Sequence, residues 1–277
     1  MTETSNAVTR QDEARLLFLH GFACAKEDWK LVASFLPAHP EFSTYDFPGH
    51  GTAPAPAPQA PPDTSTSNWS IEYFAAEVVR HLQGFAAAPV ILAGHSLGCR
   101  VALEVAARAP ERVSGLVLIE ASMIGERSAD AARQQIYSLV KKSGFNQFIE
   151  NRFNEMFLSE SPMSKAILAR AKNIDPAGGT ALFANMAGWD AGLMATRLGR
   201  FTKPMLIIQS MYFDAHGKRR PIDETSESSW LQFVSCVAPT ARIELVKESG
   251  HFPHIEQPEK IAHLLREFVS EISTLRS

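Results

Sequence analysis

A serine stands between two glycines in the stretch G-H-S-L-G at 94–98. The apolar run V-I-L-A comes shortly before it, and a helical pattern that ends near Arg108 follows it. A chain that passes from a buried strand into a helix over so few residues must turn sharply, and small flanking residues permit that turn. The Ser96 hydroxyl would then project at the start of the helix, and Ser96 is the candidate nucleophile. The free backbone N–H of Leu97 could stabilise an oxyanion there.

Six short apolar stretches alternate with helical patterns and must position this serine. They cover residues 15–20, 42–47, 89–93, 113–119, 204–209 and 242–246. Strands that alternate with helices form a parallel sheet with helices on both faces, so the pattern predicts an α/β fold. Residues 121–200 interrupt the alternation, because they show no convincing strand. Helical patterns cover 131–142, 145–157 and 165–172 in that segment. We therefore expect a helical insertion between the fourth and fifth strands.

Four stretches carry a resemblance to a known family. They are L-H-G-F at 19–22, D-F-P-G-H-G at 46–51, G-H-S-L-G at 94–98 and G-H-F-P-H-I-E at 250–256. In their order and in their places between strands, they resemble the α/β-hydrolase family over nearly the whole chain. The resemblance implies a mostly parallel central sheet with helices on both faces. It also implies a core of residues 1–120 and 201–277 and a helical cap, or lid, at 121–200.

The resemblance also assigns a base and an oxyanion hole. A serine hydroxyl is a weak nucleophile at neutral pH and needs an adjacent general base. His251 follows the last predicted strand, where the resembled family has its catalytic histidine, and we prefer it to the nearby His254. The oxyanion donors would be the backbone N–H groups of Leu97 and of Phe22, in the loop after the first strand.

Two residues compete for the acid that would orient the histidine. Glu120 ends the apolar strand G-L-V-L-I-E, and an acidic side chain there is costly to bury unless it has a partner. Asp214 lies beyond the strand that follows the insertion, where the family usually places an aspartate. However, Asp214 stands one residue late, and Ser210 replaces the family's usual glycine. We favour Glu120 and keep Asp214 as the alternative acid.

Composition limits the class of partner. The net charge is −3, so the chain has neither a nucleic-acid footprint nor a basic surface for membranes. Its three cysteines are widely spaced and the first residues are polar, which favours a cytoplasmic protein with free thiols. No metal and no cofactor are required by the predicted residues. The sequence leaves a homodimer open.

These features predict a serine hydrolase for a small, largely apolar ester, lactone or related acyl substrate, acting through an acyl-enzyme. Aromatic residues and methionines in the insertion would roof an apolar cavity that adapts to its ligand. The same triad could instead cleave a carbon–carbon bond or transfer an acyl group. A receptor for a small molecule, with this fold and little or no turnover, is the alternative outside catalysis.

Overall fold

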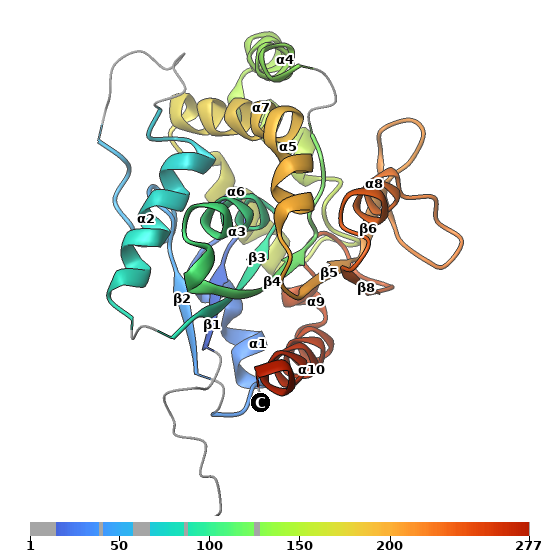
Figure 1. Cartoon of the computed structure of the whole chain (residues 1–277). Coiled ribbons are helices and arrows are strands. Elements are labelled where there is room, and N and C mark those ends of the chain that lie inside the picture. Colours follow the sequence, from blue (N-terminus) through green and yellow to red (C-terminus); the bar gives the residue numbers. More distant parts are fainter. Residues whose placement is uncertain (1–14, 39–40, 58–66, 86–87, 125–127, 277) are drawn as a thin grey trace, which may run out of the picture.

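The computed structural model describes residues 15–38, 41–57, 67–85, 88–124 and 128–276 (Figure 1). Their centre is one sheet of six strands in the order β2-β1-β3-β4-β5-β8, and all neighbouring strands run parallel. The strands are β1 (Arg15–Leu19), β2 (Phe42–Tyr45), β3 (Val90–His95), β4 (Val113–Ile119), β5 (Met205–Gln209) and β8 (Arg242–Leu245). All six match predicted stretches, and the α/β class is confirmed.

The two faces of the sheet pack into separate apolar cores. Successive side chains of a strand point to opposite faces, so Leu17 and Leu19 join one core while Leu16 and Phe18 join the other. The first core is covered by α2 (Ile71–Gln83) and α3 (Leu97–Arg108), together with α8 (Ser229–Val237). The second is covered by α10 (Pro258–Arg276), which packs with α1 (Lys30–Ser34). Burial on both faces explains why the inner strands β1, β3, β4 and β5 are largely apolar in sequence, whereas the edge strands β2 and β8 are only partly buried and carry polar residues.

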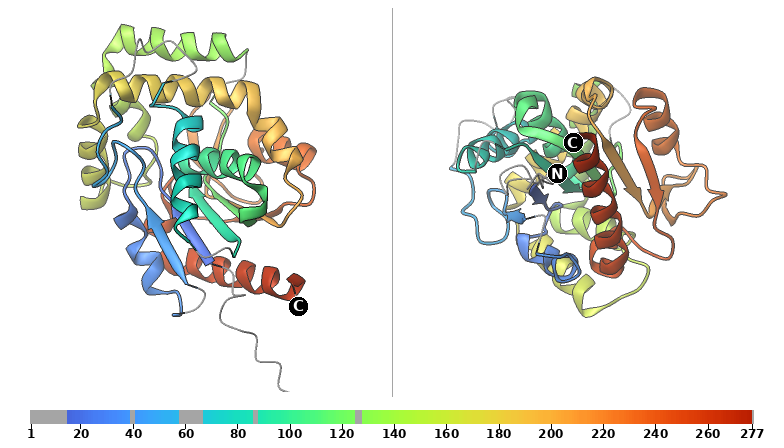
Figure 2. Two further views of the ribbon diagram at one scale, coloured as in Figure 1. Left: turned by 60° about the vertical axis from the view of Figure 1, so that its left-hand side comes forward. Right: turned by 60° about the horizontal axis from the view of Figure 1, so that its bottom comes forward.

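Four helices lie between β4 and β5 in the chain. They are α4 (Ala129–Ser143), α5 (Phe145–Phe153), α6 (Pro162–Lys172) and α7 (Pro176–Arg200). The first three correspond to predicted helical patterns, but α7 was not predicted as one long helix. Its glycines are packing positions, since a Cβ on Gly179 or Gly188 would collide with Phe145 or Arg133 respectively. Figure 2 shows α4 stacked on α7 at one end of the molecule and α10 toward the other end.

A two-stranded hairpin follows β5 and was not predicted. Its strands, β6 (Met211–Phe213) and β7 (Arg219–Pro221), pair antiparallel. The remaining short elements are η1 (Lys26–Trp29), η2 (Pro110–Arg112) and α9 (Pro253–Glu256). Across the described part of the chain, no helix combines the length and apolar character needed to cross a membrane.

Candidate active site

Ser96 occupies the turn between β3 and α3 with a strained backbone. Its φ is +51° and its ψ is −106°, a conformation that a residue with a side chain rarely adopts. The flanking glycines make this turn possible. A Cβ on Gly94 would collide with the backbone of Gly98, and a Cβ on Gly98 would collide with the carbonyl of Leu19. The turn predicted from G-H-S-L-G is therefore present, and it raises Ser96 at the carboxyl edge of the sheet.

The loop after β1 packs closely against this turn. A Cβ on Gly21 would lie 2.6 Å from His95 Nδ1, so only glycine lets the loop come this near. Buried His20 fixes the loop: its Nδ1 donates to Gly21 O at 2.7 Å, and its Nε2 accepts from Phe47 N at 3.0 Å. Beside it, Phe22 lines the same cavity as Ser96.

The two predicted oxyanion donors lie at the start of α3 and in the loop after β1. Leu97 is the first residue of α3, where a backbone N–H has no partner within the helix. No backbone hydrogen bond found among the described residues uses the N–H of Phe22 or Leu97. Both groups therefore remain free for a ligand.

His251 lies in the loop between β8 and α9 and is 1% exposed. The ring of His95 holds this loop, since its Nε2 donates to the carbonyl of His251 at 2.7 Å. His251 Nδ1 bonds to Glu120 Oε2 at 2.8 Å, whereas Nε2 has no hydrogen-bond partner within the described ranges. His251 also lines the cavity that Ser96 lines. The free nitrogen is the one that a general base needs.

Glu120 follows the last residue of β4 and is fully buried. Its φ is +54°, a second strained position at the site. Oε1 accepts three hydrogen bonds, from Ser210 N at 2.5 Å, Ser210 Oγ at 2.9 Å and Met211 N at 2.9 Å. Ser210 and Met211, which follow β5, therefore hold the Glu120 carboxylate through Oε1, and Oε2 is left to bond to His251.

Burial controls the charge of both partners. Desolvation raises the pKa of Glu120 to about 6, although nearby Arg219 and the bonds from Ser210 and Met211 oppose this rise. Desolvation also lowers the pKa of His251 well below its ordinary value, and Arg219 lowers it further. At neutral pH the pair is therefore a carboxylate and a neutral imidazole that donates from Nδ1.

Asp214, the alternative acid, belongs to the turn of the β6–β7 hairpin. Its Oδ1 accepts from the backbone of His216 and Lys218 at 2.9 Å, and its Oδ2 accepts from Arg220 Nε at 2.9 Å. These bonds hold its pKa down, to about 2. Of the two candidate acids, Glu120 is hydrogen-bonded to His251, whereas Asp214 stabilises the turn of the hairpin.

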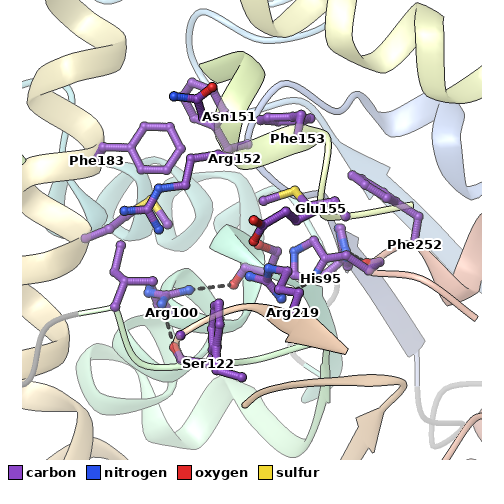
Figure 3. Close-up of a pocket in the computed structure, with 18 residues that line it drawn as sticks. His95, Arg100, Ser122, Asn151, Arg152, Phe153, Glu155, Phe183, Arg219 and Phe252 are labelled. Atoms are coloured by element: carbon purple, nitrogen blue, oxygen red, sulfur yellow. Dashed lines mark hydrogen bonds between the residues drawn. The ribbon is translucent and has the colours of Figure 1, made fainter. Parts of the chain in front are cut away.

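The cavity above Ser96 has a volume of about 280 Å³ and lies between the sheet edge and the inserted helices. The insertion contributes Phe153, Met156, Phe183 and Met186 from the residues predicted to roof a pocket. The lining is not only apolar, because four charged side chains also reach it (Figure 3). These are Arg100, Arg152, Glu155 and Arg219.

A buried ion pair links α3 to α7 beside the cavity. Arg100 donates to both carboxylate oxygens of Asp190 at 2.7 Å, and also to the carbonyls of Ser96 at 3.2 Å and Ser122 at 2.6 Å. Asp190 in turn accepts from Ile124 N at 2.8 Å. Sequence reasoning missed this pair, since its members are 90 residues apart. The sequence signal that could have indicated the pair is Arg100 itself, a charged residue within the mostly apolar sequence of α3.

Arg219 reaches the site from β7 and was also missed. Its Nη1 lies 3.8 Å from Glu120 Oε2 and 3.2 Å from His251 Nδ1. The same imidazole nitrogen cannot donate to Glu120 and accept from Arg219, so we assign the proton to the shorter, charge-assisted bond to Glu120. The guanidinium therefore acts on the imidazole as a neighbouring charge.

No group of histidine, cysteine, aspartate or glutamate side chains within the described ranges has the arrangement of a metal site. The chemistry that the arrangement supports is nucleophilic attack by a hydroxyl. Ser96 and His251 line one cavity and Glu120 is bonded to His251, an arrangement compatible with such an attack.

Comparisons with known proteins identify the family of the chain. A family model described as "Alpha/beta hydrolase family" matches residues 16–264. A putative 2-succinyl-6-hydroxy-2,4-cyclohexadiene-1-carboxylate synthase of Bacillus subtilis is 25% identical over 92% of this chain and 89% of its own length. A pimeloyl-acyl-carrier-protein methyl ester esterase of Aromatoleum aromaticum is 26% identical over 92% and 97% respectively.

A similar solved structure is the enol-lactonase from Burkholderia xenovorans LB400. It has a TM-score of 0.71 at 16% identity and covers 94% of this chain and 92% of its own. Another curated relative is much longer, and the chain spans only 15% of that protein's length. The family model covers nearly all of the described sheet and helices, and named relatives include esterases. The chain is therefore an enzyme that belongs to the alpha/beta hydrolase family.

Proposed function

We propose that the protein is a serine hydrolase for small esters or lactones, with Ser96, His251 and Glu120 as its triad. One observation carries the proposal. His251 Nδ1 is bonded to the buried carboxylate of Glu120, while its unpartnered Nε2 belongs to a side chain that shares a cavity with Ser96. This is the arrangement by which a carboxylate fixes the tautomer of a histidine base.

In the proposed reaction, His251 Nε2 accepts the proton of Ser96 Oγ as the oxygen attacks the carbonyl carbon of the substrate. The backbone N–H groups of Phe22 and Leu97 bind the oxyanion of the tetrahedral intermediate. The imidazolium then gives its proton to the leaving alkoxide, and an acyl-Ser96 ester remains. Water, activated by the same nitrogen, attacks this ester and restores Ser96.

In this proposal, residues 121–200 are a helical cap over the active site, and residues 1–120 and 201–277 form the core. Residues of α5 and α7 form one wall of the cavity, and Phe22 and Phe252 of the core form part of the other. The relatives support the substrate class, since one is named a methyl ester esterase and a similar structure is an enol-lactonase. Free thiols at all three cysteines support a cytoplasmic location.

The test is hydrolysis of p-nitrophenyl butyrate and of a set of lactones, together with labelling by a serine-directed phosphonate. We expect turnover and stoichiometric labelling of the unmodified protein. In Ser96→Ala, labelling should be absent and turnover should fall by at least about 10³-fold. Ser235→Ala, on the exposed side of α8, is the matched control and should behave as the unmodified protein does.

The alternatives give different results. A receptor would show neither labelling nor turnover, and Ser96→Ala would change nothing. Transfer of the acyl group would appear as acylated acceptor in place of free acid. Cleavage of a carbon–carbon bond by the same triad would appear as turnover of a substrate that has no ester bond.

A further inference from the structure

We propose that the cavity is built for a substrate with an anionic group, such as a carboxylate, which Arg152 and Arg219 bind while Ser96 attacks an ester at the other end. This inference rests on the proposed function, because it names the substrate class of the same site. It departs from the largely apolar substrate expected from the sequence. Two observations support the proposal: Arg152 and Arg219 line the cavity, and several of their N–H donors have no partner among the described residues.

Arg219 is a buried cation with unused donors. Its side chain is 8% exposed, and its guanidinium carbon lies 4.5 Å from the centre of the Phe213 ring. Burial lowers its pKa to about 10, so it remains charged at neutral pH. Only Nη1 approaches a polar partner, and Nε and Nη2 make no hydrogen bond to any described residue. Since Arg219 lines the cavity, a ligand can reach those donors.

Arg152 faces the same space from the insertion. Its guanidinium lies over the ring of Phe148, 5.3 Å from the ring centre, and burial lowers its pKa. It forms neither a hydrogen bond nor an ion pair with another described residue. Figure 3 shows the side chain extending from α5 into the cavity. The side chain is partly buried and its N–H donors have no described protein partner, so a bound anion would form charge-assisted hydrogen bonds with them.

The remaining charges do not supply that anion. Arg100 already has Asp190 as its counter-charge and uses its other hydrogen bonds on the carbonyls of Ser96 and Ser122, so its charge is matched within the protein. Glu155 is the one carboxylate among the cavity's described lining residues, and it favours the charged forms of both Arg152 and Arg219 without a hydrogen bond to either. Arg219 also has Glu120 as a counter-charge at 3.8 Å. The unused N–H donors of Arg152 and Arg219, and not a surplus of positive charge, are therefore what the cavity offers to an anion.

The shape of the group follows from the donors. A guanidinium presents parallel N–H groups that match the two oxygens of a carboxylate, and its aromatic support holds the plane in place. The cavity is about 280 Å³, and its uncharged lining combines phenylalanines and methionines with a few small polar residues, which suits a short chain between the two functional groups. The substrate class is therefore a small ester or lactone that also carries a carboxylate, for example the monoester of a dicarboxylic acid.

The experiment compares two p-nitrophenyl esters that differ in one charge: the glutarate monoester and its methyl-capped diester. We expect the unmodified protein to have a kcat/KM at least tenfold higher for the anionic ester. Arg152→Met and Arg219→Met should each lower the ratio of anionic to neutral kcat/KM by about tenfold to a hundredfold, the range that a hydrogen bond to a charged group supplies. The ratio cancels effects of either substitution on folding or on the chemical step.

Arg80→Met is the matched control, since it removes the same charge from the exposed side of α2. It should leave the ratio unchanged. A wild-type preference for the neutral ester would overturn the proposal, and so would a ratio that neither cavity arginine affects. If no ester is hydrolysed, calorimetric measurement of glutarate binding tests the anion site independently of catalysis. Binding that Arg152→Met weakens upholds the anion site while the hydrolase proposal fails, and absence of binding overturns the anion site as well.

Discussion

Replacing Glu120 by glutamine separates its role as an acid from its role in packing. The amide has nearly the same shape as the carboxylate but only one acceptor oxygen. Three donors converge on Oε1, from the backbone and side chain of Ser210 and the backbone of Met211. The amide oxygen must stay with those donors, so its NH₂ group is forced to face His251 Nδ1 at 2.8 Å.

The size of the effect follows from the tautomer. With an N–H group opposite, Nδ1 must accept, and the single proton of the neutral imidazole moves to Nε2. A protonated Nε2 cannot remove the proton of Ser96. A triad with its carboxylate changed to an amide loses about 10⁴-fold in kcat, which is about 5.5 kcal/mol of transition-state stabilisation. We expect Glu120→Gln to lose between about 10³-fold and 10⁴-fold, because the backbone donors of the oxyanion hole remain.

The assay is the kcat of p-nitrophenyl butyrate hydrolysis, with thermal unfolding of each variant to verify that it folds. Asp214→Asn is the matched control. Asparagine keeps an acceptor for the backbone N–H groups of His216 and Lys218, so we expect activity within about threefold of the unmodified protein. The assignment of the acid would be refuted if Asp214→Asn lost activity by 10³-fold while Glu120→Gln kept most of it.

Two further predictions concern stability. Burial lowers the pKa of His254 well below its ordinary value and that of His20 to about 3, so both are neutral when folded and take up protons on unfolding below about pH 6.5. The free energy of unfolding should therefore decrease as the pH falls below 6.5, by up to about 1.4 kcal/mol per pH unit for each such histidine. Equal urea midpoints at pH 7 and pH 5 would contradict this prediction. Asp190→Asn should lower the free energy of unfolding in urea by about 3–5 kcal/mol, because it leaves Arg100 buried without its counter-charge. Asp130→Asn, which removes an exposed ion pair, is the control and should barely change the urea midpoint. Similar effects of the two substitutions would contradict the prediction.

The fold was predictable from sequence because its strands carry a strong local signal. The four inner strands are buried on both faces and therefore largely apolar, and a polar residue or proline stands at one or both ends of each. The turn around Ser96 was also predictable, because the close contact of Gly94 with Gly98 lies within the turn itself. The contact of Gly98 with the carbonyl of Leu19 in β1 joins distant segments, but the pattern of two glycines around a serine indicates the turn without it.

Other features were hidden because they depend on contacts between distant segments. The glycines of α7 resemble helix breaks in sequence, but they are small because Phe145 and Arg133 pack against them. The β6–β7 hairpin lacks a two-residue turn of the usual type, so no hairpin signal stood out. Without a hairpin signal, nothing in the sequence indicates that Arg219 lies beside His251.

The position of the acid and the presence of Arg219 are physically connected. Glu120 engages Ser210 and Met211, the first residues after β5, so that segment does not have to supply the carboxylate. It continues instead as a hairpin that delivers Arg219 to within 3.8 Å of Glu120. The guanidinium lowers the pKa of His251 and so weakens the base when the cavity is empty. In the proposed complex a substrate carboxylate would neutralise Arg219, the pKa of His251 would rise toward the working pH, and the base would become stronger only once the substrate is bound.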